Sequence, residues 1–483
     1  MHRVALYWLR RDLRLTDNPA LQYACERADR VVLAYIHAPD EEQPWQPGAA
    51  SQWWLHHSLT SLNEALAKRN QRLIVRTGPS LAALRDLIRE SEATLVVWNR
   101  LYEPAIVARD TKVKVSLQED GVEVESHNAA LLFEPWAIRT QQGTPFKVFT
   151  PYWRVCAAQL DQVAPPLPAP KTIGTLDRQL VTGTLDSLQL LPTVAWDIGI
   201  AAKWQPGERG ALRRLQIFEG VSDQYPDARD RPAVAGTSLL SPHLHFGEIS
   251  PRQLCAALLG TTHTARNAQG VAAFLRELGW REFAHHLLYH FPQTTDEPFN
   301  SKFIGLKWKK DSAGLRAWQG GKTGIPLVDA GMRELWTTGT MHNRVRMIVA
   351  SVLTKNLGIH WREGARWFWE TLVDADLASN SLGWQWVAGS GADAAPYYRI
   401  FNPVLQSERF DGEGIYLRRW LPEIGRLSNK HIHSPWTASE DELTKAGITL
   451  GKTYPRPIVD LKASRDAALQ NYRRWTEQPA APG

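Results

Sequence analysis

The sequence of 483 residues has very little cysteine and no long apolar run. Its three cysteines (Cys25, Cys156 and Cys255) are far apart, which excludes a disulfide framework and a zinc knuckle. No stretch of about 20 apolar residues could span a membrane. The apolar run Val4–Leu9 is also too short for a signal peptide. We therefore expect a cytoplasmic protein in a reducing compartment.

Tryptophan is unusually abundant, since the sequence contains 21 Trp but only 12 Tyr and 13 Phe. Hydrophobic residues make up 43% and charged residues 22%, ordinary values that exclude a disordered or fibrous chain. The net charge is +6, and because residues 1–204 are balanced, the whole basic excess lies in 205–483. Such an excess fits either a polyanionic partner or an ordinary solvated basic surface.

Short apolar segments alternate with helical patterns over the first 130 residues. This alternation predicts an N-terminal doubly wound parallel sheet covered by helices. We expect strands at 3–9, 31–37, 72–76, 94–99 and 122–126, and helices from Pro19 and at 51–69, 80–90 and 104–119.

A proline-rich stretch, Ala164–Pro170, can continue neither helix nor sheet and opens a connector that runs to about Gly207. Beyond it, 3.6-residue periodicity predicts helices at 208–218, 251–259, 270–289, 324–337, 342–357 and 361–372. The expected fold class is α/β plus all-α. The expected domains are an α/β domain over 1–132, a connector over 133–204 and an all-helical domain over 205–475.

Three common binding patterns are incomplete in this sequence. Gly321-Lys322-Thr323 resembles the end of a P-loop, but Arg316 stands where the first glycine is needed. His286 and His290 have the spacing of a helical zinc site, but Leu287 replaces the glutamate. No G-x-G-x-x-G occurs, so the dinucleotide fingerprint is missing. We expect neither a P-loop nor a metal site.

Two clusters of polar and aromatic residues fall on predicted helices. Glu277, Trp280 and Arg281 share one helix face, where they could read a base; a surface ion pair beside a half-buried tryptophan is the alternative. The second cluster is Met341–Met347. Its members Asn343, Arg346 and Met347 share one face and Arg344 points elsewhere, which an ordinary amphipathic helix would also explain.

The third cluster is a polar stretch from Asp374 to Trp386 that continues to Pro403. Two acids two residues apart, Asn380, a glycine and two tryptophans are unusual in a core helix. We therefore expect a loop whose side chains bind a polar ligand. A metal would need further acids or histidines at fixed offsets, which are missing.

These clusters resemble the photolyase/cryptochrome family of flavoproteins, and most closely its bacterial cyclobutane pyrimidine dimer photolyases. The similarity begins at Tyr7–Arg14 and runs to about Pro457. Its most specific stretches are Gly236–Ser238, Trp280–Phe283, Gly321–Gly324, Met341–Met347, Asp374–Trp386 and Arg399–Pro403.

The resemblance implies a folded-up FAD in the helical domain. Asp374 would pair with Arg346 over the flavin ring, and Asn380 would face flavin N5. A second, antenna chromophore stays open between a folate, a deazaflavin and none, because Ala105-Ile106 stand where folate-binding relatives have Asn-Glu. The implied FAD contacts are Tyr225, Thr237, Ser238, Leu239, Leu240, Ser241, Phe274, Glu277, Arg281, Asn343, Arg346, Asp374, Ala375, Asp376 and Asn380.

The resemblance also implies light-driven repair of UV-damaged DNA. Reduced anionic FAD would give one electron to a flipped-out cyclobutane pyrimidine dimer, which splits and returns the electron. Catalytic roles would fall to Glu277 and Asn343, which would hydrogen-bond the lesion. The implied lesion and DNA contacts are Arg229, Trp280, Arg344, Met347, Trp386 and Arg399. The implied electron-transfer chain from surface to flavin is Trp318, Trp361 and Trp384.

Two rival functions stay open: a cryptochrome-type light sensor and a (6-4) photolyase. Met347 stands where (6-4) enzymes carry a proton-donating histidine, and a thioether is neither acid nor base. Asn380 replaces the acid of plant cryptochromes, which favours repair, and Thr340 replaces a tryptophan that walls the lesion pocket in bacterial relatives. We expect a monomer without membrane contact, in the bacterial cytoplasm and on the nucleoid when bound to DNA.

Overall fold

The computed structural model describes residues 3–262, 264–394 and 399–477. Residue contacts divide the chain into two compact units. The first unit comprises Met1–Asp223, Ser238–Pro292 and Val373–Ala378, and the second comprises Gln224–Thr237, Gln293–Leu372 and Ser379–Gly483. The stretch Val373–Ala378 therefore belongs with the N-terminal part of the chain, although it lies far along the sequence.

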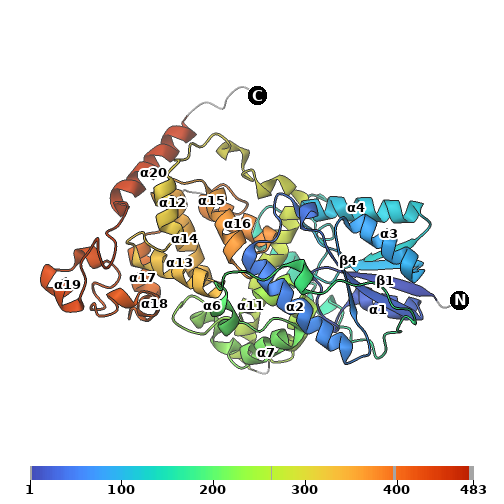
Figure 1. Ribbon diagram of the computed structural model, residues 1–483. Helices are drawn as coiled ribbons and strands as arrows, with labels where there is room; N and C mark the ends of the chain where they lie inside the picture. The colour runs from blue at the N-terminus through green and yellow to red at the C-terminus, as the bar shows by residue number, and fades with distance from the viewer. Residues whose placement is uncertain (1–2, 263, 395–398, 478–483) are drawn as a thin grey trace. The chain divides into compact units, whose positions relative to one another are not determined.

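A five-stranded parallel sheet in the order β3-β2-β1-β4-β5 lies in the first unit (Figure 1). This order confirms the predicted doubly wound sheet, because the chain returns from β3 to pair β4 with β1. Tyr7 of β1 pairs with Leu33 of β2 on one side and with Val97 of β4 on the other. The strands are β1 (Val4–Leu9), β2 (Arg30–His37), β3 (Leu73–Thr77), β4 (Leu95–Asn99) and β5 (Glu123–His127).

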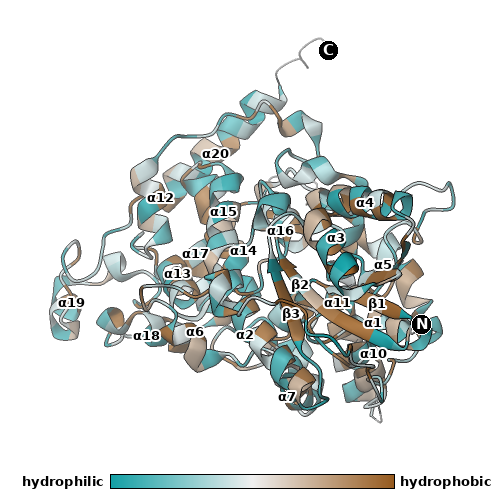
Figure 2. Cartoon of the chain, turned by 45° about the vertical axis from the view of Figure 1, so that its right-hand side comes forward, coloured by the Kyte–Doolittle hydropathy of each residue, from teal (hydrophilic) through white to brown (hydrophobic). Residues whose placement is uncertain are grey.

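Both faces of the sheet are buried, so its inner strands are apolar almost throughout, as Figure 2 shows for β2. Ala5, Tyr7 and Leu9 enter one core, with residues of α1 (Pro19–Arg27) and α2 (Ala49–Ala67). Leu6 and Trp8 enter the opposite core, with residues of α3 (Ser80–Ser91) and α4 (Pro104–Glu119).

The carboxyl ends of β1 and β4 meet at the switch point of the sheet, where open α/β sheets bind ligands. Here the side chains pair with one another. Arg10 Nη1 lies 2.7 Å from Asp110 Oδ2, and the Arg10 guanidinium lies 4.6 Å from the Trp8 ring. Asn99 Nδ2 donates to Asp12 Oδ2 at 2.7 Å.

The rest of the first unit is helical, and the predicted connector contains only short helical pieces. The longest helix, α11, begins after Thr264, whose hydroxyl accepts a hydrogen bond from the amide of Asn267. The helices are α5 (Phe149–Ala157), α6 (Ile198–Lys203), α7 (Glu208–Glu219), α9 (Ser241–His245), α10 (Pro251–Leu259) and α11 (Ala265–His290).

Helices also build the second unit, as predicted. A π-helical stretch, Val352–Asn356, continues α14 without a break. Among the described residues, no helix combines the length and apolarity that a bilayer crossing requires. The helices are α8 (Tyr225–Ala228), α12 (Ser312–Gln319), α13 (Pro326–Thr338), α14 (Asn343–Ser351), α15 (Trp361–Thr371), α16 (Leu377–Ala388), α17 (Pro403–Phe410), α18 (Ile415–Trp420), α19 (Glu440–Ala446) and α20 (Leu461–Thr476).

The prediction of a loop from Asp374 to Trp386 is wrong for most of its length, because α16 begins at Leu377. Leu377, Ala378 and Trp384 are buried, so an apolar side of this stretch packs into the protein and stabilises a helix. Only the segment before Leu377 is non-helical. Residues 395–398, which fall in the predicted continuation of the loop, lie outside the described residues.

Candidate functional site

Two segments with predicted FAD contacts meet in the first unit although they are far apart in sequence. The Ser241 hydroxyl donates to Asp374 Oδ2 at 2.6 Å. Before it, Leu239 adopts a left-handed conformation (φ 55°), and the amide of Leu240 donates to Ser238 Oγ at 3.3 Å. The tight turn 238–241 therefore presents hydroxyls and backbone amides beside a carboxylate.

Asp376 lies between two histidines of the first unit. Its Oδ2 is 3.5 Å from His245 Nδ1 and 3.4 Å from His285 Nε2. Burial alone would raise the pKa of Asp376, but the two imidazoles hold it well below its usual range. Burial likewise opposes the charge on His285, yet Asp376 raises the pKa of this histidine. Asp376 is therefore a buried carboxylate at neutral pH.

The predicted base-reading face of α11 is held by packing and hydrogen bonds within the first unit. The Trp280 ring stacks on Phe149 at 3.7 Å between ring centroids. Arg281 Nη1 donates to the carbonyl oxygen of Ala130 at 2.7 Å, so this guanidinium also anchors the segment after β5. Glu277 is only partly buried. Trp280 and Arg281 are therefore fixed by contacts within the first unit, and Glu277 on the same face is partly exposed.

The start of α14 carries the second predicted cluster. His342 caps this helix because its Nδ1 accepts a hydrogen bond from the amide of Arg344 at 3.2 Å. Burial lowers the pKa of His342 to about 4, so this ring is neutral. Asn343 is exposed at the first helical position and Met347 is partly buried one turn later.

The arginines predicted to contact phosphates or flavin differ in their surroundings within the second unit. Arg344 Nη2 lies 2.7 Å from Asp230 Oδ1. Arg346 donates from Nε to the carbonyl of Met341 at 2.8 Å and from Nη2 to Thr340 Oγ1 at 3.4 Å. Thr340 thus supports Arg346.

The remaining predicted DNA and cofactor residues are placed as follows. Arg229 lies over the ring of Tyr225 at 5.4 Å, and Arg399 is exposed. Phe274 contacts Phe218 at 4.6 Å between ring centroids. The pairing of Arg346 with Asp374, and the binding of one lesion by both Glu277 and Asn343, stay predictions. Thr237, Ala375 and Trp386 likewise keep their predicted roles without a test.

Trp384 of α16 packs against α15. A Cβ placed on Gly364 would lie 2.0 Å from Trp384 Cη2, so the indole covers this glycine directly. The Trp384 ring is 5.0 Å from Phe368 and 6.1 Å from Trp318 between centroids. Gly364 stands three residues after Trp361 on the same helix, which brings Trp384 close to the next predicted member of the electron-transfer chain.

Trp318 is 0% exposed, so it does not provide the solvent-facing end that the predicted chain needs. Sequence reasoning missed Trp308, which is partly exposed. Its ring is 5.0 Å from His360, and His360 is 5.6 Å from Trp361. A signal for Trp308 was present, because its neighbours Lys307, Lys309 and Lys310 indicate an exposed segment.

Asn380, predicted to face flavin N5, lies on α16 and is partly exposed. Its Nδ2 donates to the carbonyl oxygen of Ala365 on α15 at 3.0 Å. This bond fixes the orientation of the amide, because the nitrogen must point toward α15 and the oxygen away from it. The acceptor oxygen is therefore the atom that is left for a ligand.

Residues of the zinc-like and P-loop-like patterns form hydrogen bonds within the protein. His286 Nε2 accepts a hydrogen bond from the amide of Phe146 at 3.1 Å. The amides of Thr323 and Gly324 donate to the buried Asp329, so they are not presented to a phosphate. Within 3–262, 264–394 and 399–477, no group of three or more acids, histidines or cysteines could hold a metal ion.

The donor set fits FAD. The turn 238–241 and the acids Asp374 and Asp376 offer hydroxyls, amides and carboxylates of the kind that bind ribityl hydroxyls and phosphates. Trp384 Nε1 is buried and has no hydrogen-bond partner within the described residues, which leaves a polar atom for a ligand or water.

Comparison with known proteins agrees with this donor set. The family described as DNA photolyase matches residues 5–171, and the FAD binding domain of DNA photolyase matches residues 274–474. A deoxyribodipyrimidine photo-lyase of Agrobacterium fabrum is 48% identical over 97% of both chains. Cryptochrome-1 of Arabidopsis thaliana is 38% identical over 95% of this chain and 69% of its own length.

The solved structures agree as well. A bacterial class III photolyase from Agrobacterium tumefaciens superimposes with a TM-score of 0.95 at 46% identity, covering 99% of this chain and 98% of its own. These matches confirm the predicted fold class, the FAD cofactor and an enzyme of the photolyase class. The chain thus belongs to the photolyase/cryptochrome family of flavoproteins.

Proposed function

We propose that this protein repairs cyclobutane pyrimidine dimers in DNA in a reaction driven by blue light. The hydrogen bond from Ser241 to Asp374 carries the proposal, because it joins two of the segments that the resemblance assigns to FAD. The name of the Agrobacterium relative, a deoxyribodipyrimidine photo-lyase, supports the same reaction. Bound FAD in its reduced anionic form would supply one electron to the lesion when light excites it.

Glu277 and Asn343 would bind the flipped-out dimer. Both side chains are at least partly accessible and carry groups that hydrogen-bond pyrimidine carbonyl and imide groups. Donors aimed at a carbonyl where negative charge develops stabilise the transition state. Met347 would form an apolar, polarisable wall, which suits a cleavage that needs no proton shuttle.

A tryptophan chain would carry electrons from the surface when the cofactor has become oxidised. Trp384 would be its inner member and Trp361 its middle member, because Trp384 packs on α15 one turn from Trp361. Trp308 replaces the predicted Trp318 at the outer end, since only Trp308 of these two is accessible to solvent. Trp318 then packs against Trp384 as an aromatic neighbour.

Arg229, Arg344 and Arg399 would bind the phosphate backbone of the damaged DNA. The basic excess in 205–483 supports this assignment, because all three lie there. Arg344 would exchange its partner Asp230 for a phosphate on binding, whereas the exposed Arg399 is accessible as it stands. A monomer in the bacterial cytoplasm, with domains at 1–132 and 205–475, completes the proposal.

Two oligonucleotides with single defined lesions test the choice of substrate. The protein, with its flavin fully reduced beforehand, is illuminated with each under blue light. We expect restoration of the cyclobutane dimer and not of the (6-4) photoproduct, because Met347 cannot transfer a proton. Restoration of the (6-4) lesion alone would contradict the proposal, and restoration of neither would favour a light sensor.

A further inference from the structure

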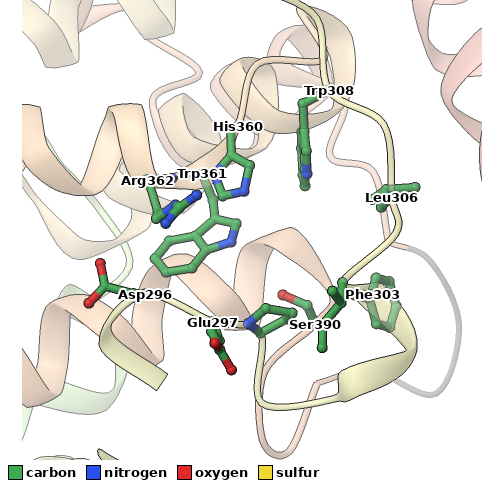
Figure 3. Close-up of a pocket in the computed structure, with 11 residues that line it drawn as sticks. Asp296, Glu297, Phe303, Leu306, Trp308, His360, Trp361, Arg362 and Ser390 are labelled. Atoms are coloured by element: carbon green, nitrogen blue, oxygen red, sulfur yellow. Dashed lines mark hydrogen bonds between the residues drawn. The ribbon is translucent and has the colours of Figure 1, made fainter. Parts of the chain in front are cut away.

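A cavity of about 400 Å³ lies within the second unit at the outer end of the tryptophan chain (Figure 3). This volume falls in the range of roughly 300–1,000 Å³ that is typical of small-molecule sites. Trp308, His360, Trp361 and Phe303 line the cavity, and the His360 ring lies between the two indoles. The cavity can therefore take a flat ring against aromatic walls.

Two polar groups in the cavity are available to a ligand. The Ser390 hydroxyl is buried, with the residue 3% exposed, and has no hydrogen-bond partner within the described residues. A buried hydroxyl without a hydrogen-bond partner destabilises the fold unless a ligand or a water molecule binds it. His360 Nδ1 accepts the amide hydrogen of Arg362 at 3.1 Å, so the neutral ring carries its proton on Nε2. Burial lowers the pKa of His360 to about 4 and keeps the ring neutral.

The lining itself carries more negative than positive charge. Asp296 and Glu297 line the cavity and Arg362 is the one cation among its lining residues, while Lys307, Lys309 and Lys310 are exposed beside Trp308. A neutral aromatic ring with hydroxyl groups fits this lining. Its face can stack on an indole, and its hydroxyl groups can accept a hydrogen bond from His360 Nε2 and form one with the Ser390 hydroxyl. Such a molecule, a hydroquinone or related dihydroxyaromatic compound, is also a reductant.

We propose that this cavity binds a neutral dihydroxyaromatic electron donor that re-reduces Trp308, an inference that rests on the proposed tryptophan chain. After oxidised Trp308 forms, one electron passes from the bound hydroquinone to the indole. The hydroquinone O–H bond breaks, its proton goes to water at the mouth of the cavity, and a neutral aryloxyl radical leaves. Trp308 is reduced by one electron and the donor is oxidised by one electron.

Binding is measured first in the dark, by saturation-transfer NMR of hydroquinone with the flavin-containing oxidised protein. We expect specific binding to the wild type and about fivefold weaker binding to Ser390→Ala, because one hydrogen bond is lost. Ser312→Ala, an exposed serine away from the cavity, should bind as the wild type does. Absence of binding, or equal binding by Ser390→Ala, would overturn the proposal.

Light then tests the electron transfer. The rate of flavin photoreduction should saturate with hydroquinone at the concentration that the dark measurement gives. Trp308→Phe should slow photoreduction at least tenfold while dark binding persists. Trp336→Phe changes an exposed tryptophan outside the cavity and should leave the photoreduction rate unchanged. A rate that rises linearly with hydroquinone would overturn the docking site.

The two proposals fail in different ways. Loss of dark binding with intact dimer repair by prereduced protein would overturn the donor site alone. Dark binding without any dimer repair would refute the proposed function and still support the cavity as a hydroquinone site.

Discussion

Replacing Gly364 by alanine tests the packing that holds Trp384 in place. A Cβ at this position would lie 2.0 Å from Cη2, 2.4 Å from Cζ3 and 2.6 Å from Cζ2 of the indole. Phe368 and Trp318 pack against the same ring, so the indole has little room to retreat. Trp384 must therefore shift or α15 must move away.

The magnitude follows from two opposing terms. Overpacking of a core costs about 1–3 kcal/mol. Alanine gains back up to about 1 kcal/mol over glycine in a helix. We expect a net loss of about 1–2 kcal/mol, which corresponds to roughly 2–8 °C in melting temperature for a unit of this size. Photoreduction should also slow, because the ring leaves its position against α15.

Gly383 on α16 provides the matched control, because a Cβ there would meet nothing within 4 Å. Gly383→Ala should raise the melting temperature or leave it unchanged, with normal photoreduction. Circular dichroism gives the melting temperature, and flavin absorbance under blue light gives the photoreduction rate. A Gly364→Ala protein as stable and as readily photoreduced as the Gly383→Ala protein would refute the packing argument.

Three further predictions concern charge and hydrogen bonding. The raised pKa of His285 and the lowered pKa of Asp376 stabilise the fold between about pH 4 and the raised His285 pKa. This contribution is lost as pH rises through the folded pKa of His285 or falls through that of Asp376. His285→Gln should therefore flatten the pH profile of thermal stability, and an unchanged profile would count against the ion pair. Arg399→Ala should reduce the steepness of the plot of log affinity for lesion DNA against log salt concentration by about one. An unchanged slope would show that Arg399 does not contact a phosphate. Asn380→Asp should shift the flavin reduction potential and absorbance, because a carboxylate cannot donate to Ala365 and brings charge, and spectra identical to wild type would contradict its role.

Much of the fold could be predicted from the sequence because local patterns and tertiary packing agree. The strand predicted at 94–99 is observed as Leu95–Asn99, and the helix predicted at 104–119 is observed with those bounds. The strand is a short, continuously apolar run that is buried on both faces, and in the helix Ile106, Val113 and Leu117 are buried at helical spacing.

The stretch after Asp374 is a place where prediction from local sequence patterns fails. Its polar residues favoured a loop, yet Leu377, Ala378 and Trp384 are buried and α16 forms around them. Tertiary burial outweighs local preference at such a place. The roles of Trp308 and Trp318 could not be separated either, because solvent exposure of each indole depends on contacts far along the chain.

The hydrogen bond between Ser241 and Asp374 could not be predicted from the residues alone, since 133 positions separate its partners. Only the resemblance to a family placed both near FAD. The Ser390 hydroxyl is a second example, because the sequence contains no pattern that marks it as buried and unpaired.

The most direct test of light-driven repair counts dimers split per flavin. Prereduced protein is illuminated anaerobically with excess thymine-dimer oligonucleotide and no added reductant, while flavin absorbance is followed. Because the electron returns after each cleavage, we predict many restored dimers per flavin and a flavin that stays reduced. Restoration of one dimer or fewer per flavin with matching flavin oxidation, or equal restoration in the dark, would contradict the account.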